Sequence, residues 1–202
     1  PFIDIANVKY FIGIGRDRNG HIPGDLLNYH FNEAGYKKVF NDKSAVILEN
    51  PKALSRAYFP LYFKVVNQAK IEDIMMIDST FDPRTTALLE KDLKIATTSG
   101  KGLSSILNYT PNMVKIKTEA ENPEILILAD QYDEGWKAKV DEEEVPISPA
   151  NYIFRAGKVP AGKHEVVFNY YPKSFDIGLK ISLVTLGSII LLSMFVIKRK
   201  QF

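Results

Sequence analysis

Near its C-terminal end the chain changes from mixed apolar and polar residues to one long apolar run. Residues 177–197 contain a single charged residue, Lys180, and a basic tail at 198–200 follows them. As a helix with a rise of about 1.5 Å per residue, this run is about 30 Å long, the thickness of the hydrocarbon core of a bilayer. The pattern predicts a transmembrane helix over residues 175–198 and a tail at 199–202.

Upstream of this helix, apolar and polar residues alternate in short segments separated by turn residues, which is typical of β-strands. Pro60 suits an edge strand, because proline cannot donate a hydrogen bond to a neighbouring strand. Turn residues at 41–44 and 160–162 predict that the strands flanking each turn pair with one another. The predicted strands are 8–14, 36–41, 45–49, 57–66, 113–117, 124–129, 136–140, 145–147, 152–155 and 164–171.

Two short helices are predicted between these strands. The first, over residues 69–78, has apolar residues at i, i+3 and i+4 on one face. The second, over 84–91, follows an Asp82-Pro83 pair that resembles an N-cap with proline at the first helical position. Residues 16–35 are predicted as a loop and 97–102 as a flexible connector, because both are rich in breaking residues.

These elements predict a mainly β protein. Short strands with frequent turns indicate an antiparallel β-sandwich of jelly-roll-like form, with two short helices and one C-terminal transmembrane α-helix. Residues 1–104 are predicted to form an N-terminal β/α lobe, and residues 105–174 a C-terminal β-sandwich lobe. The chain has 202 residues, enough for such a core and a membrane helix.

Charge and composition exclude several functions. Four of the 26 cations lie beyond Asp176, where no acidic residue occurs, so residues 1–176 carry 22 cations against 24 acids. Such a balance predicts no nucleic-acid surface. The chain has no cysteine, so it has no disulfide and no thiolate metal site. His21, His30 and His164 are scattered without a metal-binding spacing, and no metal site is predicted.

The basic tail predicts the orientation of the chain. Cations at 198–200 favour a cytoplasmic C-terminus, which places the preceding domain outside the membrane. A domain reaches that side only through a signal or an earlier membrane span, and the chain opens with neither. We therefore expect the C-terminal part of a longer membrane protein. The alternative is a tail-anchored protein with a cytosolic domain. Lys173 and Lys180, at the domain end of the helix, are compatible with this opposite orientation.

The only tryptophan, Trp136, leads to a hypothesis of sugar binding. An aromatic face packs on a sugar ring, while carboxylate and guanidinium groups bind hydroxyls. The alternatives are that Trp136 caps the sandwich core and that His164 is a structural residue rather than a base. No nucleophile–base pair can be proposed from spacing, so no residue is predicted to be catalytic. The glycan-contact candidates are Asp130, Tyr132, Trp136, Tyr152, Arg155 and His164.

Small residues recur along the predicted membrane helix. They follow one another at intervals of four, three and three, which places them on one face. Such stripes let helices approach closely in lipid, so we expect packing against other membrane spans of the same chain. The residues of this stripe are Gly178, Ser182, Thr185 and Ser188.

Nine segments spread along the chain are informative when taken in order: 8–10, 49–51, 56–59, 81–84, 130–138, 140–141, 151–156, 159–164 and 170–178. Together they resemble the C-terminal end of the YfhO family of bacterial membrane proteins. Each piece is weak alone, and the combination is specific. Glu142 and Ser55 depart from the family, which tends to have glycine and proline at these positions.

The resemblance implies a many-spanning protein of the GT-C glycosyltransferase type in the bacterial cell membrane. Such proteins transfer a sugar from a polyprenyl-phosphate donor to a cell-envelope acceptor, using a catalytic carboxylate on early extracytoplasmic loops. This chain would then be a non-catalytic extracytoplasmic domain without a cofactor of its own. It would cover the active-site face or bind acceptor glycan. The alternatives are a membrane-anchored carbohydrate-binding module and a structural cap of the helix bundle.

Overall fold

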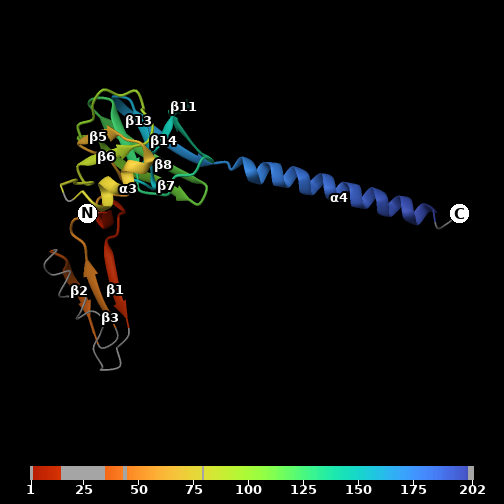
Figure 1. Ribbon diagram of the computed structural model, residues 1–202, viewed down its shortest axis with the longest axis horizontal. Helices are drawn as coiled ribbons and strands as arrows, with labels where there is room; N and C mark the ends of the chain where they lie inside the picture. Colours follow the sequence, from red (N-terminus) through yellow and green to blue (C-terminus); the bar gives the residue numbers. More distant parts are fainter. Residues whose placement is uncertain (1, 15–34, 43–44, 79, 200–202) are drawn as a thin grey trace.

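The computed structural model describes residues 2–14, 35–42, 45–78 and 80–199. Figure 1 shows a β-rich body, a small sheet that projects from it, and a long C-terminal helix that extends in another direction. The elements are α1 (Phe2–Ile5), β1 (Tyr10–Ile14), β2 (Lys37–Asn41), β3 (Ala45–Glu49), β4 (Ala57–Tyr58), β5 (Tyr62–Val65), α3 (Gln68–Met76), β6 (Thr86–Leu89), β7 (Leu103–Thr110), β8 (Met113–Ala120), β9 (Glu124–Leu128), β10 (Trp136–Val140), β11 (Glu143–Val145), β12 (Ile147–Ala150), β13 (Phe154–Val159), β14 (Gly162–Tyr170) and α4 (Lys173–Arg199).

The body is a sandwich of two sheets, which confirms the predicted mainly β fold. One sheet has the order β11-β10-β14-β8-β7 and the other the order β4-β9-β13-β12-β6-β5. All pairs are antiparallel except β5 with β6, which run parallel. The second sheet takes strands from both sides of residue 104, and the division into two lobes at that residue stays a prediction.

The main core lies between the two sheets. Val114 and Ile116 of β8 and Phe168 of β14 pack from the five-stranded sheet against Leu126 and Leu128 of β9. On β8 these buried residues alternate with lysines on the outer face, and Lys115 Nζ lies 2.8 Å from a Glu165 carboxylate oxygen there. One face of this sheet is therefore dry and the other is solvated.

The central strands of the six-stranded sheet are buried on both faces, whereas its edge strand β5 is largely exposed. Ile125 and Ile127 point away from the main core into a second cluster, where Ile5 of α1 and Met75 of α3 join them. This explains why every residue of β9 is buried, as its continuous apolar sequence predicted. The helix predicted over 69–78 is confirmed as α3, with Asn67 as its N-cap.

The projecting sheet has the order β1-β3-β2 (Figure 1). Strands β2 and β3 pair antiparallel, which confirms the hairpin predicted at 41–44. At its described end, Ala45 N donates to Asp42 Oδ1 at 2.8 Å.

The second predicted helix, over 84–91, is wrong. Asp82 does form a capping turn, since its Oδ1 accepts from Arg84 N at 3.0 Å, but the chain then enters strand β6. Ala87, Leu88 and Leu89 are fully buried, and β6 pairs with both β5 and β12. Burial on both sides and strand pairing outweigh the local helical signal at this position.

Three other predictions need correction. The strand predicted over 57–66 is two strands, β4 and β5, which form the opposite edges of the six-stranded sheet on either side of Pro60. The strands flanking 160–162 do not pair with each other, because β13 and β14 belong to different sheets. The connector 97–102 is anchored, since the buried Glu124 carboxylate accepts hydrogen bonds from Thr98 and Ser99.

The C-terminal helix α4 continues from β14 and extends away from the body (Figure 1). Its segment Lys173–Met194 is the one helix in the described part of the chain that is long and apolar enough to cross a membrane. None of this segment is buried, so its apolar side chains have no protein environment among the described residues. Residues 16–34 of the loop predicted at 16–35, with His21 and His30, lie outside the described residues. The end of the tail at 200–202 also lies outside them.

Candidate functional site

Two concavities meet at Trp136. The larger, which we name the junction groove, has a volume of about 920 Å³ and lies between the end of the sandwich and the first residues of α4. The smaller, the Arg155 pocket, has a volume of about 260 Å³ and is lined by Tyr109, Asp130 and Arg155 among others. Trp136 lines both. It is therefore the wall that the two concavities share.

Trp136 is held at the first position of β10 by contacts on several sides. It pairs with Tyr170 of β14, and the two ring centroids are 5.1 Å apart. Gly135 makes this approach possible: a Cβ atom there would lie 2.7 Å from the Tyr170 ring and 3.1 Å from Pro172 Cα. The indole also packs against the main core. Its position is thus fixed by the packing of β10, β14 and the start of α4.

Arg155 occupies one face of the indole. Its guanidinium carbon lies 3.7 Å from the Trp136 ring centroid and 5.4 Å from that of Phe168. The side chain is only 1% exposed, and burial lowers the pKa of Arg155 to about 10, although the nearby Asp130 carboxylate acts in the opposite direction. The residue stays charged at neutral pH. A sugar can therefore meet only the other face or the edge of the indole.

Asp130 is the carboxylate that pairs with this buried cation. It follows β9, and its Oδ2 accepts from Arg155 Nη2 at 3.1 Å. Its Oδ1 accepts from Arg56 Nη1 and from the Tyr109 hydroxyl, both at 3.1 Å. Arg155 Nη1 donates to Gln131 O at 2.8 Å. The network joins the residue before β4, strand β7, the end of β9 and strand β13.

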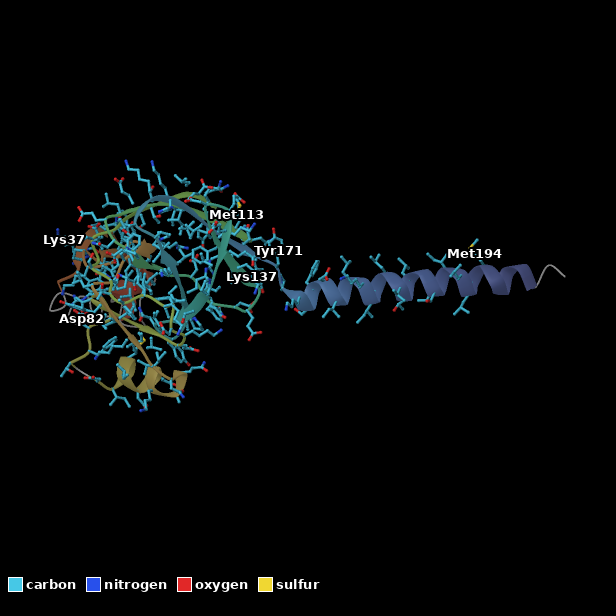
Figure 2. The ribbon with its side chains drawn as sticks, turned by 90° about the horizontal axis from the view of Figure 1, so that it is seen from above. Lys37, Asp82, Met113, Lys137, Tyr171 and Met194 are labelled. Atoms are coloured by element: carbon cyan, nitrogen blue, oxygen red, sulfur yellow. The ribbon has the colours of Figure 1, made fainter. Side chains whose placement is uncertain are left out.

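The junction groove lies at the end of the domain from which α4 departs. Figure 2 shows Lys137, which lines the groove, and Tyr171 at this end, whereas Lys37 and Asp82 lie at the opposite end. Tyr132 lines the groove, with Lys91 Nζ 6.0 Å from its ring centroid. Aromatic walls therefore alternate with charged groups, an arrangement suited to a polar ligand with apolar faces.

The six glycan-contact candidates do not form one site. Asp130, Trp136 and Arg155 come together at the Arg155 pocket, and Tyr132 joins Trp136 in the junction groove. Tyr152 is half exposed, has a φ of 76°, and lines neither concavity among the described residues. Their role in binding glycan stays a prediction.

His164 lies near the opposite end of β14 from the Trp136–Tyr170 pair. Its Nδ1 is 2.5 Å from Asp141 Oδ2, and its Nε2 is 2.9 Å from Ala161 O. The hydrogen bond with Asp141 is the main cause that raises the pKa of His164. Because both ring nitrogens face acceptors, the protonated ring satisfies this turn best. The residue fastens the turn before β14 to the turn after β10.

The sequence reasoning missed Arg56 and Tyr109. Arg56 lies just before β4 and Tyr109 near the end of β7, and their side chains meet at 2.8 Å. Both are far from Asp130 in the sequence, so no local pattern connects them. One signal could have pointed to Arg56: it belongs to segment 56–59, which is part of the family resemblance.

The described side chains form two concavities lined by aromatic and charged groups. Among the described residues, no group of three or more His, Asp or Glu side chains could hold a metal ion. On α4 the four small residues are exposed, and two of them, Thr185 and Ser188, donate hydrogen bonds to the helix's own carbonyl groups at 2.9 Å. Their hydroxyls therefore add little polarity to the stripe.

The fold and the exposed apolar helix define a membrane protein with a β-sandwich domain. The family described as "Bacterial membrane protein YfhO" matches residues 83–182. A relative named "Uncharacterized protein YfhO" from Bacillus subtilis (strain 168) is 31% identical over 188 residues, which is 89% of this chain and 21% of the relative. The chain belongs to the YfhO family. It spans about a fifth of that relative's length. No solved structure matches it significantly.

Proposed function

We propose that this chain is the extracytoplasmic C-terminal domain and the last membrane span of a cell-envelope glycosyltransferase. The parent protein takes its sugar from a polyprenyl-phosphate donor, and its catalytic residues lie outside this chain. The domain covers the active-site face and binds the acceptor glycan in the junction groove. The domain then restrains the acceptor close to the membrane, where a lipid-linked donor resides.

The position of the junction groove is the observation that carries this proposal. Pro172, Lys173 and Ser174 form part of its wall, and α4 begins at Lys173. A groove built partly from the first residues of a membrane helix is held at the membrane surface. Tyr171 and Phe175 flank this point and are each 70% exposed, as expected of aromatic side chains at headgroup level.

The dimensions and chemistry of the groove suit a glycan. Its volume of about 920 Å³ is large enough for more than one sugar ring. Tyr132 and Trp136 supply aromatic surface, and Lys137 and Glu144 supply hydrogen-bonding groups of opposite charge. Such groups can satisfy hydroxyls as donors and acceptors without selecting a charged ligand.

The orientation and the membrane partners follow from the helix. Cations at 198–200 favour a cytoplasmic C-terminus, which puts the sandwich outside the cell membrane. The segment Lys173–Met194 of α4 has no buried residue, and its small-residue stripe lets another helix approach. We assign this stripe to packing against other membrane spans of the parent protein.

The test is glycan transfer by the full-length parent protein carrying Tyr132→Ala. Tyr132 is preferred to Trp136 because Trp136 packs on the core and on Arg155, so its loss would also disturb folding. We expect a rise in the KM for acceptor with little change in folding. The matched control is Tyr62→Ala, an exposed tyrosine on the edge strand β5.

Three outcomes separate the alternatives. Unchanged transfer by Tyr132→Ala would exclude acceptor binding in the groove and favour a structural cap of the helix bundle. Glycan binding by this chain, combined with a parent protein that transfers no sugar, would favour a carbohydrate-binding surface module. A KM effect confined to Tyr132→Ala would support the proposal.

A further inference from the structure

The two concavities that share Trp136 differ in the charged side chains around them. The junction groove is lined by three lysines and three acidic residues, so its charges balance: Lys91, Lys137, Lys173, Asp133, Glu134 and Glu144. The Arg155 pocket has only Asp130 and Arg155 as charged lining residues, and Arg56 contacts two residues of its wall, Asp130 and Tyr109. The lining of this pocket is therefore balanced as well, but Arg56 beside it adds a second guanidinium on the same carboxylate. The cluster of Arg56, Arg155 and Asp130 carries a net charge of +1.

Both guanidinium groups retain unused donors. Arg56 makes its hydrogen bonds through Nη1, so its Nε and Nη2 have no protein acceptor among the described residues. Its side chain is 41% exposed, so these donors are accessible. Arg155 Nε is buried and likewise lacks an acceptor in the described part of the chain. A purely structural ion pair with Asp130 would not require the second, exposed guanidinium.

We propose that the Arg155 pocket binds an anionic group, a carboxylate or a phosphate, carried by the glycan that lies in the junction groove. Arg56 is the direct ligand, with the Tyr109 hydroxyl beside it, and the buried Arg155 supplies positive charge from behind. The planar fork of arginine suits both anions because two of its N–H groups can bind two oxygens at once. This inference deepens the proposed glycan site and rests on it.

The shared wall explains how one ligand reaches both places. Trp136 separates the junction groove from the pocket beside which Arg56, Arg155 and Asp130 carry a net charge of +1, so a sugar ring on the groove side can direct a charged substituent past the indole. A neutral glycan would use the groove alone. The pocket therefore selects acidic over neutral glycans.

The experiment compares three probes on the whole chain in lipid nanodiscs: D-glucuronate, D-glucose and inorganic phosphate. Binding is followed by NMR at the indole N–H of Trp136, the only tryptophan. We expect D-glucuronate to bind at least tenfold more tightly than D-glucose, and Arg56→Gln to remove that preference. Lys117→Gln, which removes an exposed cation from β8, is the matched control and should retain it. Arg56→Lys keeps the charge without the fork and should restore only part of the preference.

Each result has a defined meaning. Equal affinity for D-glucuronate and D-glucose, both bound, would overturn the anion pocket and leave the glycan groove standing. A preference that Arg56→Gln leaves intact would also overturn it. Phosphate binding lost in Arg56→Gln and kept in Lys117→Gln would support the pocket and identify phosphate as an accepted anion. Binding of none of the three probes would count against both the pocket and the groove.

Discussion

Replacing Asp130 by asparagine tests whether the ion pair with Arg155 stabilises the domain. Arg155 is 1% exposed and Asp130 is 13% exposed, so both groups are largely removed from water. The substitution keeps the shape of the side chain and removes its charge. It leaves a guanidinium enclosed by Trp136 and Phe168 without a carboxylate partner.

The expected loss can be worked out from the geometry. Removing one partner of a buried ion pair typically destabilises a protein by about 3–5 kcal/mol. Asp130 keeps some exposure and asparagine keeps one acceptor oxygen, so we expect the lower end, a loss of about 3 kcal/mol. Even with Asp130 present, burial lowers the pKa of Arg155 from its ordinary value to about 10, a penalty of about 3 kcal/mol on the charged form.

The assay is urea unfolding of the whole chain in lipid nanodiscs, followed by tryptophan fluorescence. Trp136 is the only tryptophan and touches Arg155, so its signal reports on this region. Combining Asp130→Asn with Arg155→Met should recover most of the lost free energy of unfolding, because no unpaired charge remains buried. Asp92→Asn, which breaks an exposed ion pair with Lys94, should leave the midpoint unchanged. A loss below about 1 kcal/mol, or a double variant without recovery, would refute the reasoning.

Three further predictions concern local contacts. The hydrogen bond to Asp141 raises the pKa of His164, so an NMR titration should give a His164 pKa above about 6.5. The stability that this hydrogen bond contributes should be fully present below about pH 6.5 and should be lost as pH rises through the folded pKa. Desolvation raises the pKa of Glu124, but its hydrogen bonds lower the pKa by more, so the net shift is downward. Glu124→Gln should therefore destabilise the domain above about pH 4.5, and its effect should become smaller as pH falls. Gly135→Ala would place a Cβ 2.7 Å from Tyr170 and should lower the free energy of unfolding by about 1–3 kcal/mol.

Each of these has a clear contrary result. A His164 pKa that stays raised in Asp141→Asn would show that another group causes the shift. Equal effects of Glu124→Gln at pH 3 and pH 7 would contradict an ionised, hydrogen-bonded carboxylate. Unchanged unfolding of Gly135→Ala would mean that the chain relaxes locally at the junction with α4.

Strands with strong alternation or full apolarity were predictable from the sequence. The strands predicted at 113–117 and 124–129 correspond to β8 and β9, because their patterns reflect burial on one face and on two faces, respectively. Segment 84–91 was predicted incorrectly as a helix. Asp82 does form a capping turn, but the local sequence does not reveal the strands with which this segment pairs. The turn at 160–162 was predicted correctly. The sequence did not reveal that the chain crosses from one sheet to the other at this turn.

The candidate site shows the same limit. Trp136, Asp130 and Arg155 could be proposed because an aromatic face, a carboxylate and a guanidinium are the side-chain types that suit sugar binding. Arg56 and Tyr109 could not, because only the pairing of β4 with β9 and the packing of β7 from the other sheet against β4 bring them to Asp130. The junction groove also depends on how β14 passes into α4, which no local pattern shows.

The central claim is that the junction groove of this YfhO-family domain binds glycan. The most direct measurement is the NMR shift of the Trp136 indole N–H when soluble cell-envelope glycans, including teichoic acid fragments, are added to the chain in nanodiscs. We predict a saturable shift that Tyr132→Ala weakens and Tyr62→Ala does not. An indole signal that stays unmoved at the highest glycan concentrations would contradict the claim.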